Sequence, residues 1–421
     1  MIESEVARGR LVPDARLPAV RELAAALEVS PATVAAAYRE LKRRGFVVTE
    51  GARGTSVAPV PPARVARVSQ LPAGVRDLAS GNPDPQLLPS LAEVFARLEP
   101  SHRLYGVAAK LPELEVLAGE TFAADGLRGD LAITGGAVDA IERALQTELR
   151  SGDRVVVEDP SWPRIADLVR ALGLAIEPVP VDDRGLDPDL LDVALRRGAR
   201  AVITTPRGQN PSSAATDPDR ARTLRAVHAR YPDALVIEDD YVAGVGGADY
   251  VPVHSPDGRW TVVRSLSKVL GPDLRIALVV GDALTISRLE GRQRLSPGWI
   301  SYILQQTAAL LLTHRATGRL LARAERTYTE RRQALVAALA ARGVAAAGHS
   351  GLGVWVPLED EAAAVRELLV AGWAVGPGER FRFNSPPGIR ITTATLEPDD
   401  AEVLAEAIAG LGRSTGSTYA A

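Results

Sequence analysis

The pattern of apolar positions in the first 57 residues predicts three short helices and a hairpin, and two of the helices can be placed by their residues. The stretch from Val20 to Leu27 carries one apolar stripe and is followed by a turn. A second helix is predicted to begin after Ser30, which can cap it, with Pro31 at its first position. The buried side of this helix is predicted to consist of Val34, Tyr38 and Leu41. Two helices joined by so short a turn are typical of a helix-turn-helix.

Two short strand-like runs follow these helices. Residues 46–49 and 55–57 are apolar or β-branched, and the segment between them contains two glycines. We expect a two-stranded wing, so residues 1–57 are predicted to form a winged helix-turn-helix. Residues 58–76 are rich in proline, alanine, valine and arginine, show no period, and are predicted to form a semi-extended linker.

From Asp77 to about residue 315 the pattern changes to apolar strand-like runs that alternate with helical stretches. These runs lie at 131–133, 154–157, 201–203, 234–237, 262–263 and 277–280. Such alternation predicts a mainly parallel sheet covered by helices on both faces. Residues 316–421 are predicted to form a smaller α+β unit, which makes the whole an α/β protein with a separate N-terminal head.

Composition excludes several classes of function. The chain has 421 residues, 46% of them hydrophobic and 24% charged, as in ordinary globular proteins. It has no cysteine and five scattered histidines, so we expect neither a disulfide nor a metal site. The acidic N-terminus does not resemble a signal peptide, and no stretch is long enough to span a membrane. We therefore expect a cytoplasmic protein without a membrane partner.

Lysine is scarce in this chain. Lysine and arginine total 49, but the only lysines are Lys42, Lys110 and Lys268. Arginine can replace lysine as a surface charge, but it does not readily form a Schiff base with an aldehyde. A lysine that persists in such a chain is therefore a candidate for amine chemistry.

The segment around Lys268 contains the groups that a pyridoxal phosphate (PLP) site needs. Lys268 offers the amine for a Schiff base, while Ser265, Ser267 and Arg275 offer two hydroxyls and a guanidinium for the phosphate. The turn at Gly136 and Ala137 opens a predicted helix, whose amides can bind the same phosphate. The glycine pair at 135–136 is weak evidence by itself.

Other strand ends supply groups for the cofactor ring. Asp239 can pair with a protonated pyridine nitrogen, Tyr241 and Asn210 can bind the ring hydroxyl, and Trp162 offers a face for stacking. Each residue has an ordinary alternative as a strand cap or a core side chain. Their common order along the chain favours the cofactor site.

These motifs resemble the fold-type I, or aspartate aminotransferase, family over residues 77–413. The resemblance implies that Lys268 is the Schiff-base lysine and that the residues named above hold the ring and the phosphate. It also implies that Arg390 binds the α-carboxylate of an amino acid. Tyr105 resembles the tyrosine that reaches the phosphate of the partner subunit in a homodimer.

The chain departs from this family at several positions. Ala137 and Val138 replace common hydroxyl or amide side chains, Lys110 stands where glycine is frequent, and residues 242–244 lack acidic side chains. These changes are expected to weaken phosphate binding or reshape the ligand side. They leave the lysine, the acid and the phosphate arginine in place.

The first 57 residues resemble the GntR family of winged helix-turn-helix proteins through residues 16–24 and 29–34. Nine basic side chains there face seven acidic ones, a modest excess for a DNA-binding domain. Thr33 is the candidate base reader, and Pro31 replaces an arginine that is common at its position. The candidate DNA contacts are Arg16, Arg21, Thr33, Arg39, Lys42, Arg43 and Arg53, with Arg44 beside them.

A GntR-type head joined to an aminotransferase-like body resembles the MocR subfamily. The resemblance implies a regulator that binds double-stranded promoter DNA and senses PLP, another B6 vitamer, an amine or an amino acid through an aldimine at Lys268. We expect the body to act mainly as a sensor. A working aminotransferase with a DNA-binding head and a scaffold that has lost PLP are the alternatives.

Overall fold

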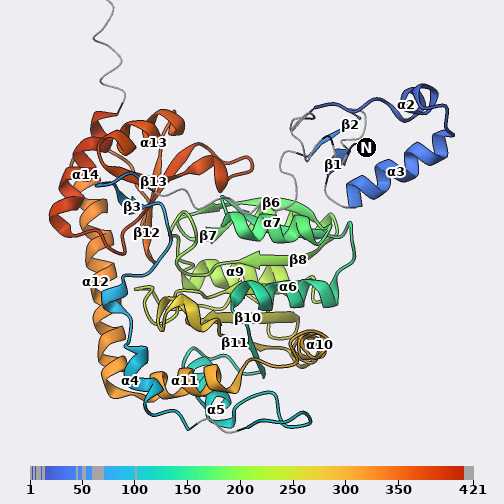
Figure 1. Cartoon of the computed structure of the whole chain (residues 1–421). Helices are drawn as coiled ribbons and strands as arrows, with labels where there is room; N and C mark the ends of the chain where they lie inside the picture. Colours follow the sequence, from blue (N-terminus) through green and yellow to red (C-terminus); the bar gives the residue numbers. More distant parts are fainter. Residues whose placement is uncertain are drawn as a thin grey trace, which may run out of the picture.

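The computed structural model describes residues 2, 5, 11, 15–43, 46–49, 54–58, 71–99 and 102–411. A small head is followed along the chain by a large α/β unit and a smaller α+β unit (Figure 1). Within this part of the chain no helix is long and apolar enough to cross a membrane. The same residues contain no group of three or more His, Asp or Glu side chains suited to a metal ion. Most of the predicted linker, residues 59–70, lies outside the described residues.

The head is a winged helix-turn-helix, as predicted. It consists of α2 (Val20–Ala26), α3 (Pro31–Arg43) and the antiparallel pair β1 (Val47–Thr49) and β2 (Thr55–Val57). Ser30 caps α3, because its Oγ accepts a hydrogen bond from Thr33 N at 3.1 Å. The Tyr38 hydroxyl donates to Pro18 O at 2.8 Å and so ties α3 to the chain before α2. The core of the head is formed by Leu17, Ala24, Val34, Tyr38, Val47 and Val57.

The large unit is built on an eight-stranded sheet with the order β4-β11-β10-β9-β8-β5-β6-β7. The strands are β4 (Asp130–Thr134), β5 (Arg154–Asp159), β6 (Ala175–Asp182), β7 (Gly185–Leu186), β8 (Ala199–Thr204), β9 (Leu235–Asp239), β10 (Arg259–Ser265) and β11 (Ala277–Gly281). The sheet is mainly parallel, as predicted, except that β11 is antiparallel to both its neighbours and β7 is antiparallel to β6. The apolar pattern did not reveal β6, because this strand is largely unburied and contains Pro178 and Pro180.

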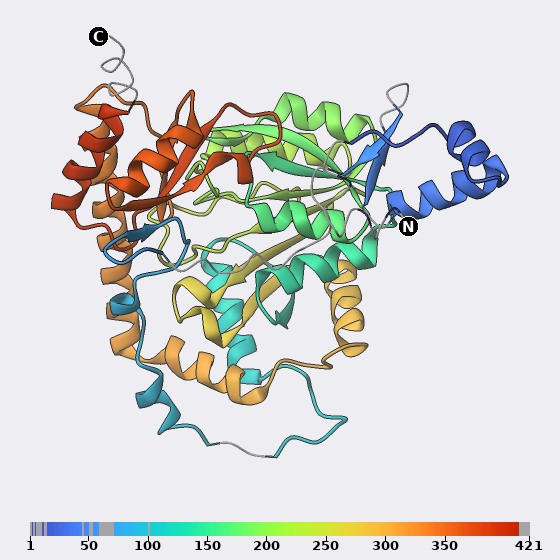
Figure 2. The same ribbon diagram turned by 45° about the horizontal axis from the view of Figure 1, so that its top comes forward.

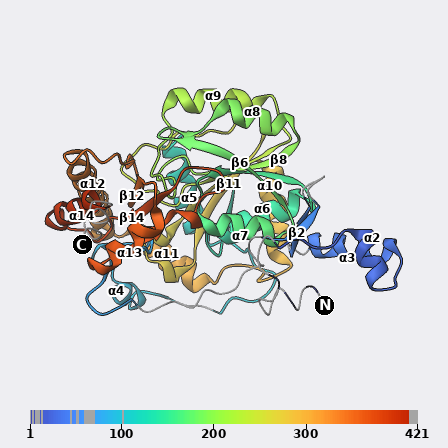
Figure 3. The same ribbon diagram turned by 90° about the horizontal axis from the view of Figure 1, so that it is seen from above.

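Helices cover both faces of this sheet. Figure 3 shows α8 (Pro188–Arg196) and α9 (Pro218–Ala229) on one side, and α6 (Ala137–Glu148) and α7 (Pro163–Ala171) on the other. Val155 and Val157 of β5 pack in the cluster with α6 and α7, whereas Val156 packs with α8 and α9. Since successive side chains of a strand point to opposite faces, burial on both sides explains the continuous apolar runs. The other helices of this unit are α4 (Leu91–Phe95), α5 (Pro112–Ala124), α10 (Ala283–Arg294) and α11 (Tyr302–Thr313).

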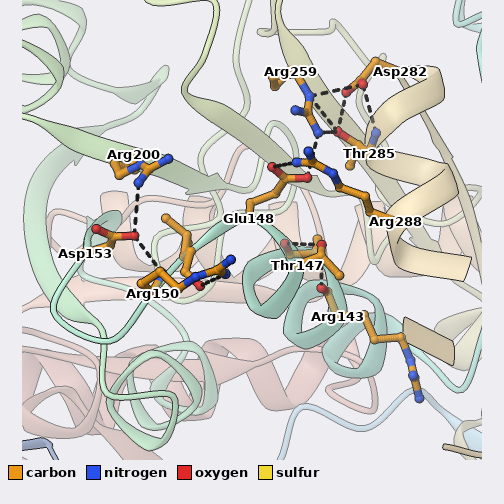
Figure 4. Close-up of polar contacts among 12 residues, drawn as sticks. Arg143, Thr147, Glu148, Arg150, Asp153, Arg200, Arg259, Asp282, Thr285 and Arg288 are labelled. Atoms are coloured by element: carbon orange, nitrogen blue, oxygen red, sulfur yellow. Dashed lines mark hydrogen bonds and ion pairs between the residues drawn. The ribbon is translucent and has the colours of Figure 1, made fainter. Parts of the chain in front are cut away.

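Ion pairs fix the sheet at the amino ends of its strands (Figure 4). Glu148, at the end of α6, accepts a hydrogen bond from Arg259 at 2.7 Å and another from Arg288 at 2.7 Å. Arg259 also pairs with Asp282 at 3.2 Å, and Asp282 caps α10. The network joins α6, β10 and α10 and leaves the opposite, carboxyl edge of the sheet open for a site.

The smaller unit packs against the long helix α12 (Arg315–Ala340), which connects the large unit to the smaller one (Figure 2). Its four-stranded sheet has the order β12-β14-β13-β3. The remaining elements are β3 (Arg76–Leu78), β12 (Gly353–Pro357), β13 (Trp373–Pro377), β14 (Gly388–Thr392), α13 (Glu361–Val370) and α14 (Pro398–Gly410). Among the described residues the 3₁₀ turns are η2 (Pro85–Leu87), η3 (Leu266–Lys268), η4 (Pro272–Leu274) and η5 (Gly378–Arg380).

One strand departs from the predicted division of the body. Residues 77–315 are predicted to form the large unit, but β3 pairs in parallel with β13 of the small sheet. Leu78 is buried in the core of that unit, which explains why the segment joins it. The limits at residues 57, 76 and 315 otherwise stay a prediction.

Candidate functional site

A cavity of about 450 Å³ lies at the carboxyl ends of the central strands, with the small sheet on its other side. Ligands of open α/β sheets bind at this edge. The cavity is lined by Arg390, predicted for a ligand carboxylate, and by nine of the residues predicted for the cofactor: Ala137, Trp162, Asn210, Asp239, Tyr241, Ser265, Ser267, Lys268 and Arg275. We call it the cofactor cavity.

Lys268 lies in the 3₁₀ turn η3 directly after β10. Ser265 begins this turn and accepts a hydrogen bond from Ser267 N at 3.3 Å. The Lys268 amine donates to the carbonyl oxygen of Gly81. Burial, together with the charge of Arg390, lowers the pKa of Lys268 to about 8 against the opposing effect of Asp239. The neutral, nucleophilic amine is therefore a larger fraction near neutral pH than it would be at the ordinary pKa of lysine.

Asp239 ends β9 and is 5% exposed. Its Oδ1 has no hydrogen-bond partner among the described residues. Burial raises the pKa of Asp239 to about 7, with further contributions from Asp240 and Glu158. A buried carboxylate oxygen without a donor is costly, and the protonated nitrogen of a pyridine ring is a donor of the right chemistry. The residues therefore fit PLP at this end of the cavity.

Tyr241 and Asn210 face the same cavity from neighbouring loops. The Tyr241 hydroxyl donates to Gly208 O at 2.7 Å, and burial raises the pKa of this phenol. Asn210 Oδ1 accepts a hydrogen bond from Arg390 Nη1 at 3.3 Å. This contact leaves the side-chain amide of Asn210 available to donate. Their roles toward a ring hydroxyl stay predictions.

A cradle for a phosphate group lies where α6 begins. Gly136 has a φ of 111° and caps this helix, and a Cβ at this position would lie 2.4 Å from Arg275 Nη2. Only glycine therefore allows the helix start and the guanidinium to approach so closely. Arg275 Nη2 donates to Gly135 O at 3.2 Å. Helix amides and a guanidinium are the groups that bind phosphate in proteins, and this end of the cavity fits one.

Arg390 lies in the middle of β14 and is 8% exposed. Its Nη2 donates to the carbonyl oxygen of Ala79. Its Nε is buried and has no partner among the described residues. Burial lowers the pKa of Arg390. The guanidinium thus keeps one unpartnered N–H, and its role toward a ligand carboxylate stays a prediction.

Two residues singled out from the sequence lie elsewhere. Tyr105 is 92% exposed, packs edge-to-face on Trp299 with ring centroids 5.5 Å apart, and does not line the cavity of its own chain. Lys110 forms ion pairs with Glu115 at 2.9 Å and Glu290 at 3.2 Å. Lys110 does not line the cavity of its own chain, and its expected effect on phosphate or ligand binding stays a prediction.

Sequence reasoning missed several residues of the cavity wall. Glu158 is 4% exposed and accepts hydrogen bonds from Thr204 Oγ1 at 2.7 Å and Gln209 Nε2 at 3.0 Å. The sequence feature that could have revealed Glu158 is an acidic residue at the end of a buried, apolar strand. The other missed residues include Gly81, Asn82, Arg164, Ser213 and Thr392. Gly81 and Asn82 form part of a Gly-Asn-Pro turn, which could have drawn attention to them.

In the head, the predicted DNA contacts that the structure describes are exposed. They are Arg16, Arg21, Thr33, Arg39 and Lys42. The Thr33 hydroxyl lies 2.8 Å from Ser30 Oγ, so base reading by Thr33 competes with capping of α3. Arg53, Arg44 and the side chain of Arg43 lie outside the described residues.

The pKa of Lys268 predicts the pH dependence of cofactor attachment. The rate of covalent attachment of PLP is expected to rise with pH and to level off above about 8, because the neutral amine reacts. Since Arg390 contributes to the lowered pKa, Arg390→Gln is expected to move the midpoint upward. Arg390→Lys retains the positive charge, so the midpoint of its pH dependence is expected to equal that of the parent. Stopped-flow absorbance at several pH values measures this, and a midpoint unmoved by Arg390→Gln would contradict it.

Two family models match the chain. Residues 73–408 match aminotransferase class I and II, and residues 1–57 match the gntR family of bacterial regulatory proteins. The first match covers most of the chain and the whole cofactor cavity.

Individual proteins show the same two-part similarity. The chain is 38% identical to the vitamin B6 salvage pathway transcriptional repressor PtsJ of Salmonella typhimurium, over 96% of this chain and 95% of that protein. It is 28% identical to the pyridoxine biosynthesis regulator PdxR of Corynebacterium glutamicum, over 78% of this chain and 74% of that protein.

A solved structure is similar to the body. It is the α-aminoadipate aminotransferase LysN of Thermus thermophilus, bound to N-(5'-phosphopyridoxyl)-L-leucine. The TM-score is 0.71 at 25% identity, and the match covers 80% of this chain and 93% of that one.

Proposed function

Because the chain belongs to the MocR-type regulators, which join a gntR-family head to a class I and II aminotransferase domain, we propose that its cofactor cavity senses a ligand and controls DNA binding. The chain is a transcriptional regulator with a PLP-dependent, aminotransferase-like body. The proposal concerns what the body detects and which residues detect it.

The proposal rests on the placement of an amine and a carboxylate in one cavity. The Lys268 amine and the unpartnered Asp239 carboxylate line one cavity, whose far end has the helix start and guanidinium of the phosphate cradle. PLP, when bound, supplies an aldehyde that reacts with amines and a pyridine ring that withdraws electrons. Lys268 would attach and orient it, Asp239 would hold the proton on the ring nitrogen, and Arg275 with the start of α6 would hold the phosphate.

We take PLP itself as the first ligand to be tested. The two named regulators that resemble this chain act in vitamin B6 salvage and pyridoxine biosynthesis by their names. PLP occupancy differs between a cell rich in vitamin B6 and one that lacks it, so a cavity that binds PLP can report this difference. Binding shifts the protein toward one conformation only if that conformation binds PLP more tightly.

The functional unit is proposed to be a homodimer. Exposed apolar side chains lie on two segments, with Leu104 73% and Leu295 79% exposed beside Tyr105. Tyr105 does not serve the cavity of its own chain. A second copy that covers this surface would bring Tyr105 to the phosphate end of the partner's cavity. Analytical ultracentrifugation of Tyr105→Ala and the parent protein tests the assembly.

A footprint on the DNA beside the gene of this protein, with and without PLP, tests the sensor role. Candidate amino acids and amines are added in separate reactions. A protected region that changes with a ligand supports the proposal. Protection that is identical under every condition would refute ligand control while leaving the DNA-binding role intact.

A second candidate function is aminotransferase activity. Arg390 lines the same cavity as Lys268, so its guanidinium could bind an amino-acid carboxylate near Lys268. Lys268 can then move a proton at the α-carbon of that ligand. Steady turnover of an amino acid with a 2-oxo acid would favour this function, and its loss in Arg390→Gln would assign the carboxylate site.

Exposed cations on α3 are proposed to contact DNA phosphates. Replacement of both Arg39 and Lys42 with glutamine is expected to weaken operator binding and to lower the slope of log K against log salt by about 0.9 per lost contact. Arg366→Gln, at an exposed position on α13, is the control and should leave the slope unchanged. Fluorescence anisotropy at several salt concentrations measures the slope, and an unchanged slope in the double variant removes both residues from the interface.

A further inference from the structure

A second cavity, of about 440 Å³, lies between α4, the end of α11 and the start of α12. Figures 1 and 2 show α4 beside the lower end of α12, at the far end of that helix from the small unit. Its polar lining includes Ser90, Glu93, His314, Thr317 and three arginines of α12. It shares no lining residue with the cofactor cavity. We call it the α12 cavity.

The three arginines are Arg319, Arg323 and Arg326. Their spacing places them on one face of the helix, where each is exposed. None of them forms an ion pair or hydrogen bond within the described part of the chain. Arg331, by contrast, lies further along α12 and donates to Asp84 at 2.8 Å and to Glu397. Three neighbouring guanidiniums that form no ion pair repel one another, so an anion between them would be stabilised.

The start of α12 adds donors to the same cavity. The helix has 26 residues, and its N-cap residue His314 makes no side-chain hydrogen bond to the first turn. The first helical bond runs from Gly318 N to His314 O, so the backbone amides of residues 315–317 remain without an acceptor. Thr317 is only 3% exposed, and its hydroxyl has no hydrogen-bond partner among the described residues. The positive end of a long helix and the Thr317 hydroxyl thus line the same cavity as the arginines.

We propose that the α12 cavity binds the phosphate group of a small anionic ligand, such as a phosphate monoester or a diphosphate. Guanidinium forks, helix amides and a hydroxyl are all donors that match phosphate oxygens. A dianion can engage several guanidiniums at once, whereas one carboxylate would leave most of them without a partner. Glu93 is the single acid of the lining, and it forms no ion pair with the arginines. The site is independent of the cofactor cavity and of the function proposed for it.

Calorimetric titration with inorganic pyrophosphate tests the site. The full chain is first loaded with PLP and reduced with borohydride, so that Lys268 and the phosphate cradle beside it are blocked. We expect saturable binding at a single site per protomer. Replacement of both Arg319 and Arg323 with glutamine is expected to weaken binding roughly tenfold for each guanidinium removed. Arg366→Gln, the exposed arginine on α13, is the control and should bind as the parent does.

Thr317→Val separates ligand binding from folding. Valine keeps the shape of the buried side chain and removes the hydroxyl, so binding should weaken while the thermal midpoint without pyrophosphate stays near that of the parent. Absence of saturable binding in the reduced parent protein would overturn the proposal, as would equal binding by the double arginine variant. Loss of DNA affinity in that variant without any pyrophosphate binding would also overturn it and assign the arginines to a nucleic-acid contact.

Discussion

Replacement of Lys268 with alanine is expected to abolish the covalent adduct that borohydride traps between PLP and the protein. Lys268 is the only one of the three lysines that lines the cofactor cavity. Lys42 lies on the exposed face of α3, and the amine of Lys110 is held by two carboxylates. Reduction, digestion and mass spectrometry of the parent protein should therefore place the pyridoxyl group on Lys268, and the variant should carry none.

Lys42→Ala is the matched control for this experiment. It removes a lysine from the same lysine-poor chain without touching the cavity, and its adduct should equal that of the parent. An adduct of full yield on another residue of Lys268→Ala would show that the assignment is wrong. Binding of PLP without covalent attachment can persist in the variant, because the phosphate cradle and Asp239 remain.

Replacement of Asp240 with asparagine is expected to cause a large loss of stability. Asp240 is fully buried and its carboxylate lies between two arginines. It accepts hydrogen bonds from Arg207 at 2.7 Å and 2.9 Å and from Arg264 at 2.7 Å. Removal of the negative charge leaves two buried guanidiniums facing each other, which should cost about 3–5 kcal/mol. Urea unfolding of the cofactor-free protein measures the free energy of unfolding.

Asp219→Asn provides the comparison for the buried pair. Asp219 pairs with Arg222 at 2.9 Å, and both side chains are more than two-thirds exposed. Exposed ion pairs contribute about 0–1 kcal/mol, so this variant should unfold close to the parent. If Asp240→Asn were no more destabilising than Asp219→Asn, the buried pairs would not be an important source of stability.

The local elements of the protein could be predicted from the sequence. The winged helix-turn-helix follows from a capping serine, helical spacing and two strand runs, and all of these depend on residues close together in the chain. The central strands were predicted because burial on both faces demands continuous apolar residues. β6 was missed because it is only partly buried, and β3 because its partner β13 lies almost 300 residues further along the chain.

Much of the cofactor site also followed from the sequence, because short motifs at strand ends hold most of its side chains. The sequence by itself determined which groups are present. These are one reactive lysine in a turn, an acid at the end of an earlier strand, and the N-terminal head. Only the tertiary structure decided which of them share a cavity. It placed Arg390 of the small sheet against Asn210, it held Lys110 away, and it left Tyr105 on the surface. It also packed α4 and the end of α11 beside the donors of α12, which forms the second cavity. Helical spacing, capping and strand burial are local and leave a trace in the sequence, whereas a cavity forms where packing brings distant segments together.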